Sequence, residues 1–220
     1  TIENDLIKDD AGKIIRDNIW GNLDQDTYRR DFTVNALYYC PISKKIIGHK
    51  DGIKDINQKK IVSIGDPQHR FSEDPVRSLR AIRFSNKLNF KIDKKIKEAI
   101  YEKGHLLSNI SNARIFDEFC KIFLNGMAEK NFNKLNSFGL NKFLITTEPK
   151  VNKFSHNVIF EALRNTDRRS KNNQSVTPGF LIAALLWPNL INRSLTKGEI
   201  NLRKFFRSMD PVLRLSLIHI

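Results

Sequence analysis

The segment EDPVRSLRAIRF, residues 73–84, decides the fold class of this chain. Asp74 followed by Pro75 is a typical helix start, with the aspartate as N-cap and the proline at the first helical position. The apolar residues gather on one side of the predicted helix: Leu79, Ile82 and Phe84. The charged residues recur every three positions and form a polar stripe along another side: Asp74, Arg77, Arg80 and Arg83. The segment therefore predicts a helix that packs on one face and presents charge on the other.

Helix signals continue from this segment towards the carboxyl end. Asp93 is expected to begin a second helix and Ser111 a third, which Gly126 can terminate. Beyond these we expect two short helices, at residues 132–138 and 154–163. A polar loop at residues 164–175 and an apolar helix at residues 178–188, which a proline closes, are expected to follow. The chain after residue 66 is thus predicted to be a helical array.

The first 66 residues differ, because short β-like runs alternate there with turns. Residues 9–15, DDAGKII, predict a turn before a short strand, and two further β-like runs are bounded by glycine-containing turns, at residues 46–47 and 61–64. Asp31 is expected to cap a helix of about three turns over residues 31–40. The predicted fold class is α+β and predominantly α-helical.

Composition indicates a folded protein with a polyanionic partner. Hydrophobic residues make up 40% and charged residues 28% of the 220 residues, which is typical of a globular chain rather than a disordered one. Lys and Arg number 38 against 24 Asp and Glu, and the resulting net charge of +14 favours nucleic acid or another anionic surface as partner. The alternative is a basic but otherwise ordinary protein.

Neither cysteine spacing nor hydropathy points outside the cytoplasm. Cys40 and Cys120 lack the spacing of a zinc site or of a disulfide framework. No window approaches the ~20 apolar residues of a membrane span, and the first residues hold no signal-peptide pattern. We therefore expect cytoplasmic residence without a membrane partner.

Arg29-Arg30-Asp31 is the first group that carries chemistry. Arginine presents a planar, permanently charged fork for phosphate oxygens. A carboxylate beside it can hold a divalent ion that bridges the same phosphates. The group therefore suits a triphosphate, and the alternative is a solvated basic pair beside a helix-capping aspartate.

Asp74 and Arg77 are the second such group. Adenine and cytosine each present an exocyclic amino donor beside a ring-nitrogen acceptor, whereas guanine and uracil reverse that order. A carboxylate acceptor beside a guanidinium donor therefore complements A and C, and it leaves unsatisfied polar groups against G and U. The alternative is a surface salt bridge worth roughly a few tenths of a kcal/mol.

Four blocks of the sequence resemble, in order and spacing, the class II nucleotidyltransferases, the family of bacterial poly(A) polymerases and CCA-adding enzymes. They are RDNIWG (16–21), RRDFTVNALYY (29–39), DGIKDINQKKIVSIGDP (51–67) and RFSEDPVRSLRAIRFSNKLNF (70–90). The resemblance implies an active-site role for Asp31 and a nucleotide-binding role for Arg30. It also implies a nucleotide-recognition helix that carries Asp74, Arg77 and Arg80. For Arg83 we favour a role in stabilising this helix, and the alternative is a contact with RNA.

The same resemblance implies the reaction and its participants. An RNA 3′-hydroxyl would attack the α-phosphate of ATP with the help of Mg²⁺, for which Asp31 is the candidate ligand. Residues 106–116 and 165–188 and the Tyr38-Tyr39 pair are similar to bacterial poly(A) polymerases, so polyadenylation of RNA 3′ ends is favoured. The alternatives are a CCA-adding enzyme that acts on tRNA and a non-catalytic RNA-binding protein.

The domain organisation also follows from the resemblance. We expect a partial nucleotidyltransferase head over residues 1–66, a neck over 67–126 and a partial helical body over 127–214. Residues 215–220 break from the Asn- and Lys-rich style of the preceding chain and are expected to be a non-native tail. The family's glycine-rich turn and DxD metal pair are expected upstream, so the fragment alone is expected to be inactive. Residues 24–26, Asp-Gln-Asp, are interpreted as a solvated acidic loop. RNA-contacting residues and the oligomeric state are not predicted.

Overall fold

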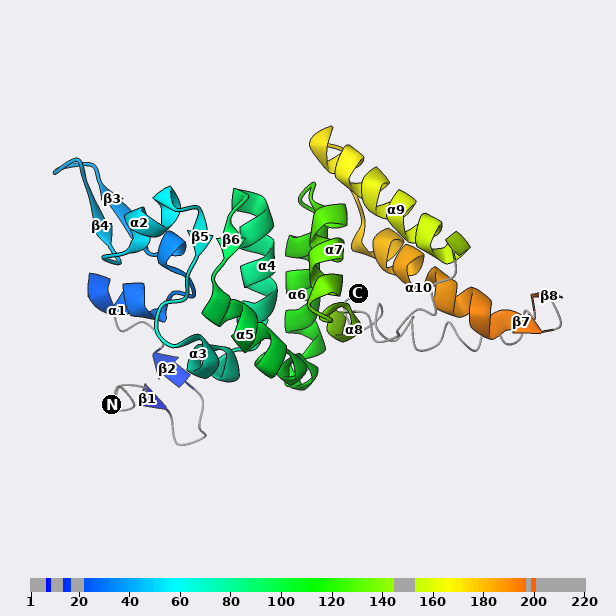
Figure 1. Ribbon diagram of the computed structural model, residues 1–220, viewed down its shortest axis with the longest axis horizontal. Helices are drawn as coiled ribbons and strands as arrows, with labels where there is room; N and C mark the ends of the chain where they lie inside the picture. The colour runs from blue at the N-terminus through cyan, green and yellow to red at the C-terminus, as the bar shows by residue number, and fades with distance from the viewer. Residues whose placement is uncertain (1–6, 9–13, 17–21, 145–152, 197–198, 201–220) are drawn as a thin grey trace.

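The computed structural model describes residues 7–8, 14–16, 22–144, 153–196 and 199–200 (Figure 1). Its elements follow one another along the long axis of the molecule, from α1 (Leu23–Arg29) near one end to α9 (Lys153–Lys171) and α10 (Pro178–Ser194) towards the other. None of the helices in this described part combines the length and apolarity that a membrane crossing requires.

Short strands and helices make up the amino-terminal part. Strands β1 (Ile7–Lys8) and β2 (Ile14–Arg16) pair antiparallel, and so do β3 (Leu37–Cys40) and β4 (Lys45–Gly48). The helical elements around the second hairpin are α1, the 3-10 helix η1 (Thr33–Asn35) and α2 (Gly52–Asn57). The strand predicted at the end of DDAGKII is confirmed by β2, and the one predicted at residues 46–47 is confirmed by β4.

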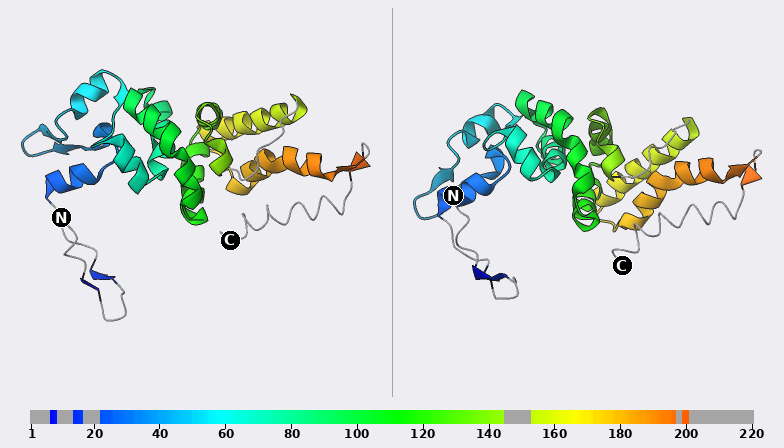
Figure 2. Two further views of the ribbon diagram at one scale, coloured as in Figure 1. Left: turned by 60° about the horizontal axis from the view of Figure 1, so that its bottom comes forward. Right: turned by 90° about the horizontal axis from the view of Figure 1, so that it is seen from below.

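Helices dominate from Pro67 onwards, and Figure 2 shows them from two further sides. Strand β5 (Lys60–Ile61) pairs in parallel with β6 (Lys91–Ile92), so the amino-terminal part is tied directly to the helical part. Strands β7 (Leu195–Thr196) and β8 (Glu199–Ile200) pair antiparallel. The α+β, predominantly helical fold class is confirmed. The remaining helices are α3 (Pro67–Glu73), α4 (Val76–Leu88), α5 (Lys94–Lys103), the 3-10 helix η2 (Gly104–Asn109), α6 (Asn112–Phe123), α7 (Ala128–Ser137) and α8 (Asn141–Leu144).

Helix α4 lies at the centre of the hydrophobic core and contacts α3, α6, α7, β5 and β6. Its apolar side is buried as predicted, with Leu79 and Ile82 both 0% exposed. Ser85 is buried on the same side, where its hydroxyl donates to the carbonyl of Ile82 and accepts from Lys134 Nζ. The arginines of the charged stripe lie on other sides of α4 and are only partly exposed: the side chains of Arg77, Arg80 and Arg83 are 13%, 34% and 15% exposed.

The helix predicted over residues 31–40 is wrong. A single 3-10 turn, η1, follows Asp31, and residues 37–40 form β3. The helix-like apolar spacing reflects the burial of Phe32 and Ala36, which are both 0% exposed. The run after them is rich in aromatic residues that favour a pleated strand, and it pairs with β4 across a tight turn.

The acidic loop predicted at residues 24–26 is also wrong, because these residues lie in the first turns of α1. Asn22 caps this helix. Asn22 Oδ1 accepts from the Gln25 N–H at 2.8 Å, and Gln25 Oε1 accepts from the Asn22 N–H at 3.0 Å. This reciprocal arrangement satisfies N–H groups that a helix start leaves free, and the aspartates beside it are favoured by the helix dipole.

Two predictions near the carboxyl end differ from the structure. Residues 164–171 belong to α9 rather than to a polar loop, because tertiary contacts hold them: Thr166 is 0% exposed and Asp167 binds the start of α7. Helix α10 does not stop at Pro188 but continues to Ser194. A proline inside a helix removes one backbone hydrogen bond, and here the helical backbone continues on both sides of it.

The starts of helices α4, α5 and α6 are close to their predicted positions. Helix α4 begins at Val76, so Pro75 rather than Asp74 is its N-cap, although Asp74 Oδ1 still accepts from the Val76 N–H at 3.2 Å. The starts predicted at Asp93 and Ser111 are confirmed by α5 and α6. The segments predicted as short helices at residues 132–138 and 154–163 lie in α7 and α9, which are longer.

Asp167 of α9 caps the amino end of α7 across the helix interface. Its carboxylate accepts from the N–H groups of Ala128 at 2.6 Å and Glu129 at 3.2 Å. We expect Asp167→Ala to lower the free energy of unfolding by about 1 kcal/mol, because it leaves these helix-start N–H groups without their acceptor. Urea unfolding measures the change, with Arg168→Ala as an exposed control on the same helix. Equal unfolding midpoints for the two variants would contradict this role of Asp167.

Candidate functional site

A polar cleft of about 380 Å³ lies where the end of α1 meets the start of α4. It brings together all five site residues predicted from the sequence, although they come from two separate motifs. Four arginines and two aspartates line it, so its electrostatic potential favours an anionic ligand. The lining residues are Arg29, Arg30, Asp31, Asn35, Asp74, Arg77, Arg80 and Phe84.

Asp31 is 5% exposed, and both of its carboxylate oxygens are hydrogen-bonded. Oδ1 accepts from the Phe32 N–H and from Asn35 Nδ2, each at 3.0 Å. Oδ2 accepts from Arg80 Nε at 2.6 Å. The turn of η1 brings Asn35 back to the carboxylate, and the buried ring of Phe32 anchors the backbone beside it. Asp31 therefore links the amino-terminal part to α4 through a direct ion pair.

These contacts do not fit a metal ion at Asp31. A divalent cation needs free oxygen ligands, whereas the two oxygens of Asp31 already accept three N–H groups. One of these donors is the Arg80 guanidinium, which already supplies positive charge at that position. Within the described residues, no group of three or more His, Cys, Asp and Glu side chains could hold an ion. The metal role of Asp31 stays a prediction, and the geometry favours Asp31 as the residue that positions Arg80.

Asp31→Asn should destabilise the protein moderately. The substitution keeps the shape of the side chain but removes the charge opposite Arg80. Because the Arg80 side chain is 34% exposed and can be partly hydrated, we expect a loss of about 1–2 kcal/mol in the free energy of unfolding. A double-mutant cycle with Arg80→Gln, measured by urea unfolding, checks the cause. If the losses of the two single variants add up to the loss of the double variant, the ion pair between Asp31 and Arg80 does not contribute to stability.

Arg30 is held at the edge of the cleft by Asp26 and Tyr38. Nη2 and Nε of Arg30 donate to Asp26 Oδ2 at 2.8 and 3.2 Å, and the guanidinium carbon lies 5.7 Å from the centroid of the Tyr38 ring. The Tyr38 hydroxyl also donates to Asp26. The hydrogen bond from Tyr38, and then the one from Arg30, lower the pKa of Asp26 below its usual value. Asp26 is thus the charged partner that directs Arg30.

Asp74 and Arg77 both face the cleft, and each is oriented by a different partner. Asp74 Oδ2 accepts from Arg114 Nη2 of α6 at 2.6 Å. Arg77 Nη1 donates to the carbonyl of Arg70 at 2.7 Å and to Glu73 Oε2 at 3.4 Å. Burial, and then the nearby charge of Arg70, lower the pKa of Arg77 below its ordinary value. Asp74 and Arg77 therefore lie in one cleft, and their hydrogen bonds are to other residues rather than to each other.

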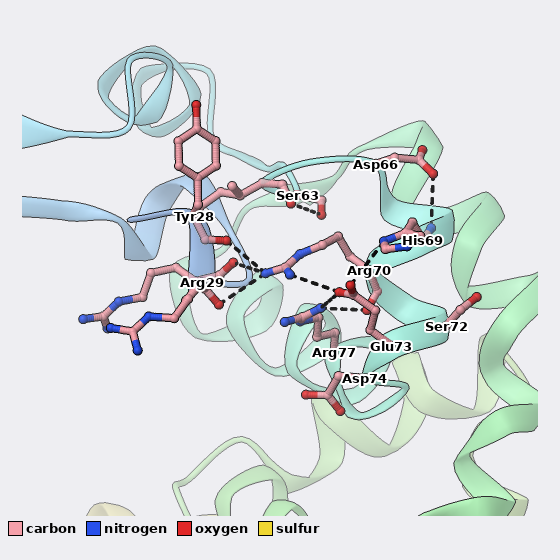
Figure 3. A network of polar contacts seen from close by, with 12 residues as sticks. Tyr28, Arg29, Ser63, Asp66, His69, Arg70, Ser72, Glu73, Asp74 and Arg77 are labelled. Carbon is pink, nitrogen blue, oxygen red and sulfur yellow. Dashed lines mark hydrogen bonds and ion pairs between the residues drawn. The ribbon is translucent and has the colours of Figure 1, made fainter. Parts of the chain in front are cut away.

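Three residues that organise the cleft were not predicted: Asn35, Arg70 and Arg114. Figure 3 shows Arg70 between the end of α1 and Arg77. Arg70 and Glu73 are three residues apart in a helix. This spacing favours an ion pair, so the pairing of Arg70 could have been predicted from the sequence. Arg114 has no such local signal, because its partner Asp74 lies 40 residues away in the sequence.

Arg83 is not among the residues that line the cleft. Its guanidinium lies 3.7 Å from Glu118 and 4.3 Å from the centroid of the Phe84 ring, and the side chain is 15% exposed. Burial lowers the pKa of Arg83, and the charge of Glu118 works against that shift. A three-residue repeat drifts around a helix of 3.6 residues per turn, so the fourth member of the stripe reaches a different neighbour. These contacts agree with the stabilising role expected for Arg83.

Two family models match the chain, one on each side of α4. Residues 3–62 match the Poly A polymerase head domain, and residues 89–154 match the probable RNA and SrmB-binding site of polymerase A. Poly(A) polymerase I of Haemophilus influenzae is 40% identical over 190 residues, which are 84% of this chain and 42% of that protein. The CCA-adding enzyme of Lactococcus lactis is 43% identical over 103 residues, which are 47% of this chain and 25% of that protein.

The fold is shared with a solved enzyme as well. The crystal structure of the Bacillus stearothermophilus CCA-adding enzyme in complex with CTP matches with a TM-score of 0.58 at 26% identity, over 90% of this chain and 45% of that one. The chain therefore belongs to the class II nucleotidyltransferases, the family of bacterial poly(A) polymerases and CCA-adding enzymes. In sequence, bacterial Poly(A) polymerase I proteins are similar to it over 82–84% of its length, at 37–40% identity. The chain spans 40–42% of the length of these relatives.

Proposed function

We propose that this chain supplies the nucleotide-selecting part of an RNA 3′-end nucleotidyltransferase that adds AMP from ATP. The observation that carries the proposal is the meeting of Asp74 and Arg77 with Arg30 in one cleft. The first two side chains suit the edge of a base, and the third suits phosphate oxygens. The similarity to proteins named Poly(A) polymerase I supports adenylation as the reaction.

Asp74 and Arg77 would read the base edge together. A carboxylate offers about four lone-pair positions, and Asp74 uses two of them for Val76 and Arg114, so it can also accept the amino group of adenine. Arg77 engages its partners through Nη1, which leaves the other nitrogens of its fork for the ring nitrogen. The Arg77 side chain is 13% exposed, so a base with reversed donors and acceptors would leave polar groups unpaired away from water.

The arginines beside this pair would hold the triphosphate. In the proposed reaction, the RNA 3′-oxygen bonds to the α-phosphorus and the bond between that phosphorus and the bridging oxygen of the β-phosphate breaks. The hydroxyl proton passes to water, and pyrophosphate leaves with its charge stabilised by guanidinium groups. Arg30 and Arg80 are the residues assigned to this task. Mg²⁺ remains expected for the activity. No step is assigned to it, because the side chains described in the cleft do not fit a metal ion.

CCA addition is the second candidate. The same Asp74–Arg77 pair complements cytosine as well as adenine, and a solved relative holds CTP. We place polyadenylation first because the similarity to a Poly(A) polymerase I covers 84% of the chain, whereas that to the Lactococcus lactis CCA-adding enzyme covers 47%.

RNA extension distinguishes the two candidates. A protein of the relatives' full length that contains this chain is incubated with generic RNA, and separately with tRNA lacking its 3′ end, in the presence of one nucleotide at a time. We expect extension of the generic RNA with ATP and not with CTP. Efficient CTP incorporation into the truncated tRNA would overturn polyadenylation. RNA binding without any incorporation would favour the non-catalytic alternative.

The other sequence predictions form part of the same proposal. They are a head over residues 1–66, a neck over 67–126 and a body over 127–214, with RNA 3′ ends as partner and the cytoplasm as location. The net charge of +14 and the match of residues 89–154 to an RNA-binding model support the RNA partner.

A further inference from the structure

The Arg70 side chain does not line the cleft but binds the carboxyl end of α1. This side chain, 19% exposed, extends from α3 towards three backbone carbonyl groups (Figure 3). Nη2 of Arg70 donates to the carbonyl oxygens of Tyr28, Arg29 and Arg30 at 3.2, 3.2 and 2.9 Å. The last carbonyls of a helix lack partners within the helix and carry partial negative charge, so a guanidinium is well placed there. Arg70 thereby fixes the backbone from which Arg29 and Arg30 project.

The same residue also orients Arg77. The backbone carbonyl of Arg70 accepts from Arg77 Nη1 at 2.7 Å. Glu73 pairs with Arg70 Nη1 at 3.1 Å and accepts from Arg77 Nη1 at 3.4 Å. Burial works to raise the pKa of Glu73, but the charges of Arg70 and His69, together with the hydrogen bonds from Arg77 and Arg70, leave that pKa below its usual value. The carbonyl acceptor is part of the backbone and stays whatever side chain residue 70 carries, whereas the second acceptor, Glu73, is held in place by the Arg70 side chain.

We propose that Arg70 is a positioning residue that sets base selectivity by tying the phosphate-facing end of α1 to the base-reading Arg77 of α4. The inference rests on the proposed nucleotide-binding function. When the phosphates of a nucleotide lie at Arg30, the fixed distance between the two elements presents its base to Arg77 in one register. Arg70 itself is not among the residues that line the cleft, so it acts through these neighbours.

Loss of Arg70 should affect base selectivity more than triphosphate affinity. Attraction between arginines and phosphates depends mainly on charge, and the charges of Arg29, Arg30 and Arg80 remain in the cleft. Discrimination between bases depends on an aligned donor and acceptor, which tolerates little displacement. A residue that merely held α1 against α3 would instead lower the stability of the protein and weaken all nucleotides equally.

Competition against a fluorescent ATP analogue on the 220-residue chain tests the proposal. We expect Arg70→Ala to lower the ratio of ATP affinity to GTP affinity about tenfold. This is the effect of losing one charged hydrogen bond, here the one proposed between the misplaced Arg77 and the base. The affinity for inorganic tripolyphosphate should fall by less than about threefold, because the arginine charges persist. Arg70→Lys should lie between wild type and Arg70→Ala, because an ammonium lacks the planar fork with which Arg70 serves the carbonyls through Nη2 and Glu73 through Nη1. Arg168→Ala, an exposed arginine of α9, is the matched control and should change neither value.

A comparison with Arg77→Ala separates positioning from a structural role. If Arg70 acts through Arg77, adding Arg70→Ala to Arg77→Ala should lower the ATP-to-GTP ratio no further. A further fall in that ratio would overturn the proposal. So would an unchanged ratio in an Arg70→Ala chain that keeps the near-UV circular dichroism of the wild type. If Arg70→Ala does not fold, unchanged ratios in both Arg70→Lys and Glu73→Gln would overturn it.

The wild-type measurement distinguishes this inference from the function on which it rests. A wild-type chain that binds ATP no better than GTP would refute the proposed function, whatever the variants do. A wild-type preference for ATP that survives every substitution of Arg70 would refute the positioning role alone.

Discussion

Arg77→Ala is expected to abolish the preference of the chain for ATP over GTP. The substitution removes the donor assigned to the ring nitrogen of adenine and leaves Asp74 to accept an amino group without the second contact. A hydrogen bond to a charged group contributes about 1.5–3 kcal/mol, which corresponds to roughly 10–100-fold in affinity. We expect ATP affinity to fall by about this factor and GTP affinity to change little, as measured by competition titration.

Two further variants control for effects unrelated to base reading. Arg77→Lys keeps a positive charge but lacks the planar fork, so it should retain triphosphate binding and lose most of the selectivity. Arg164→Ala removes an exposed arginine that pairs with Glu129 in the helical part, and should behave as wild type. An Arg77→Ala chain that unfolds at the wild-type urea concentration and keeps its ATP-to-GTP ratio would show that Arg77 does not read the base.

Phe32→Ala is expected to cause the largest loss of stability, about 3–5 kcal/mol in the free energy of unfolding. The Phe32 ring is 0% exposed and packs edge-on against Phe84, with 6.0 Å between ring centroids. Its backbone forms a bridge with Ser63, so it joins the segment after α1 to the strand region before α3. Truncation would leave a cavity beside Asp31 and loosen the ion pair to Arg80.

Urea unfolding and nucleotide binding should both report this change. Tyr39→Ala is the control, because Tyr39 is an aromatic residue of the neighbouring strand that is 65% exposed, and it should alter stability by no more than about 0.5 kcal/mol. Similar unfolding free energies for the two variants would mean that Phe32 does not anchor the junction between the amino-terminal part and α4.

The recognition helix was predictable because its signals are local. Asp74-Pro75 marks a helix start, and the spacing of Leu79 and Ile82 indicates the buried face, so the placement of Arg77 and Arg80 on a different side of the helix follows from helix geometry alone. The approach of this stripe to Arg30 and Asp31 could not be obtained from spacing, but the resemblance to a known family supplied it.

The parts that were not predictable depend on contacts between distant segments. Residues 31–40 have apolar residues at helical spacing, and it is the pairing with β4 that makes their second half a strand. The role of Asp31 as partner of Arg80 joins residues 49 positions apart, and Arg70 reaches carbonyls 40 to 42 positions away. Arg114 likewise meets Asp74 only when α6 packs beside α4.

Competition binding of all four nucleotides to the unmodified chain tests most directly whether the carboxylate of Asp74, just before α4, and the guanidinium of Arg77, in its first turn, take the place of a complementary base. The account predicts that ATP displaces a fluorescent ATP analogue at a concentration at least about tenfold lower than GTP does, and CTP at one at least about tenfold lower than UTP. Comparing purine with purine and pyrimidine with pyrimidine removes the effect of ring size. Displacement by GTP as effective as that by ATP, together with displacement by UTP as effective as that by CTP, would contradict the account.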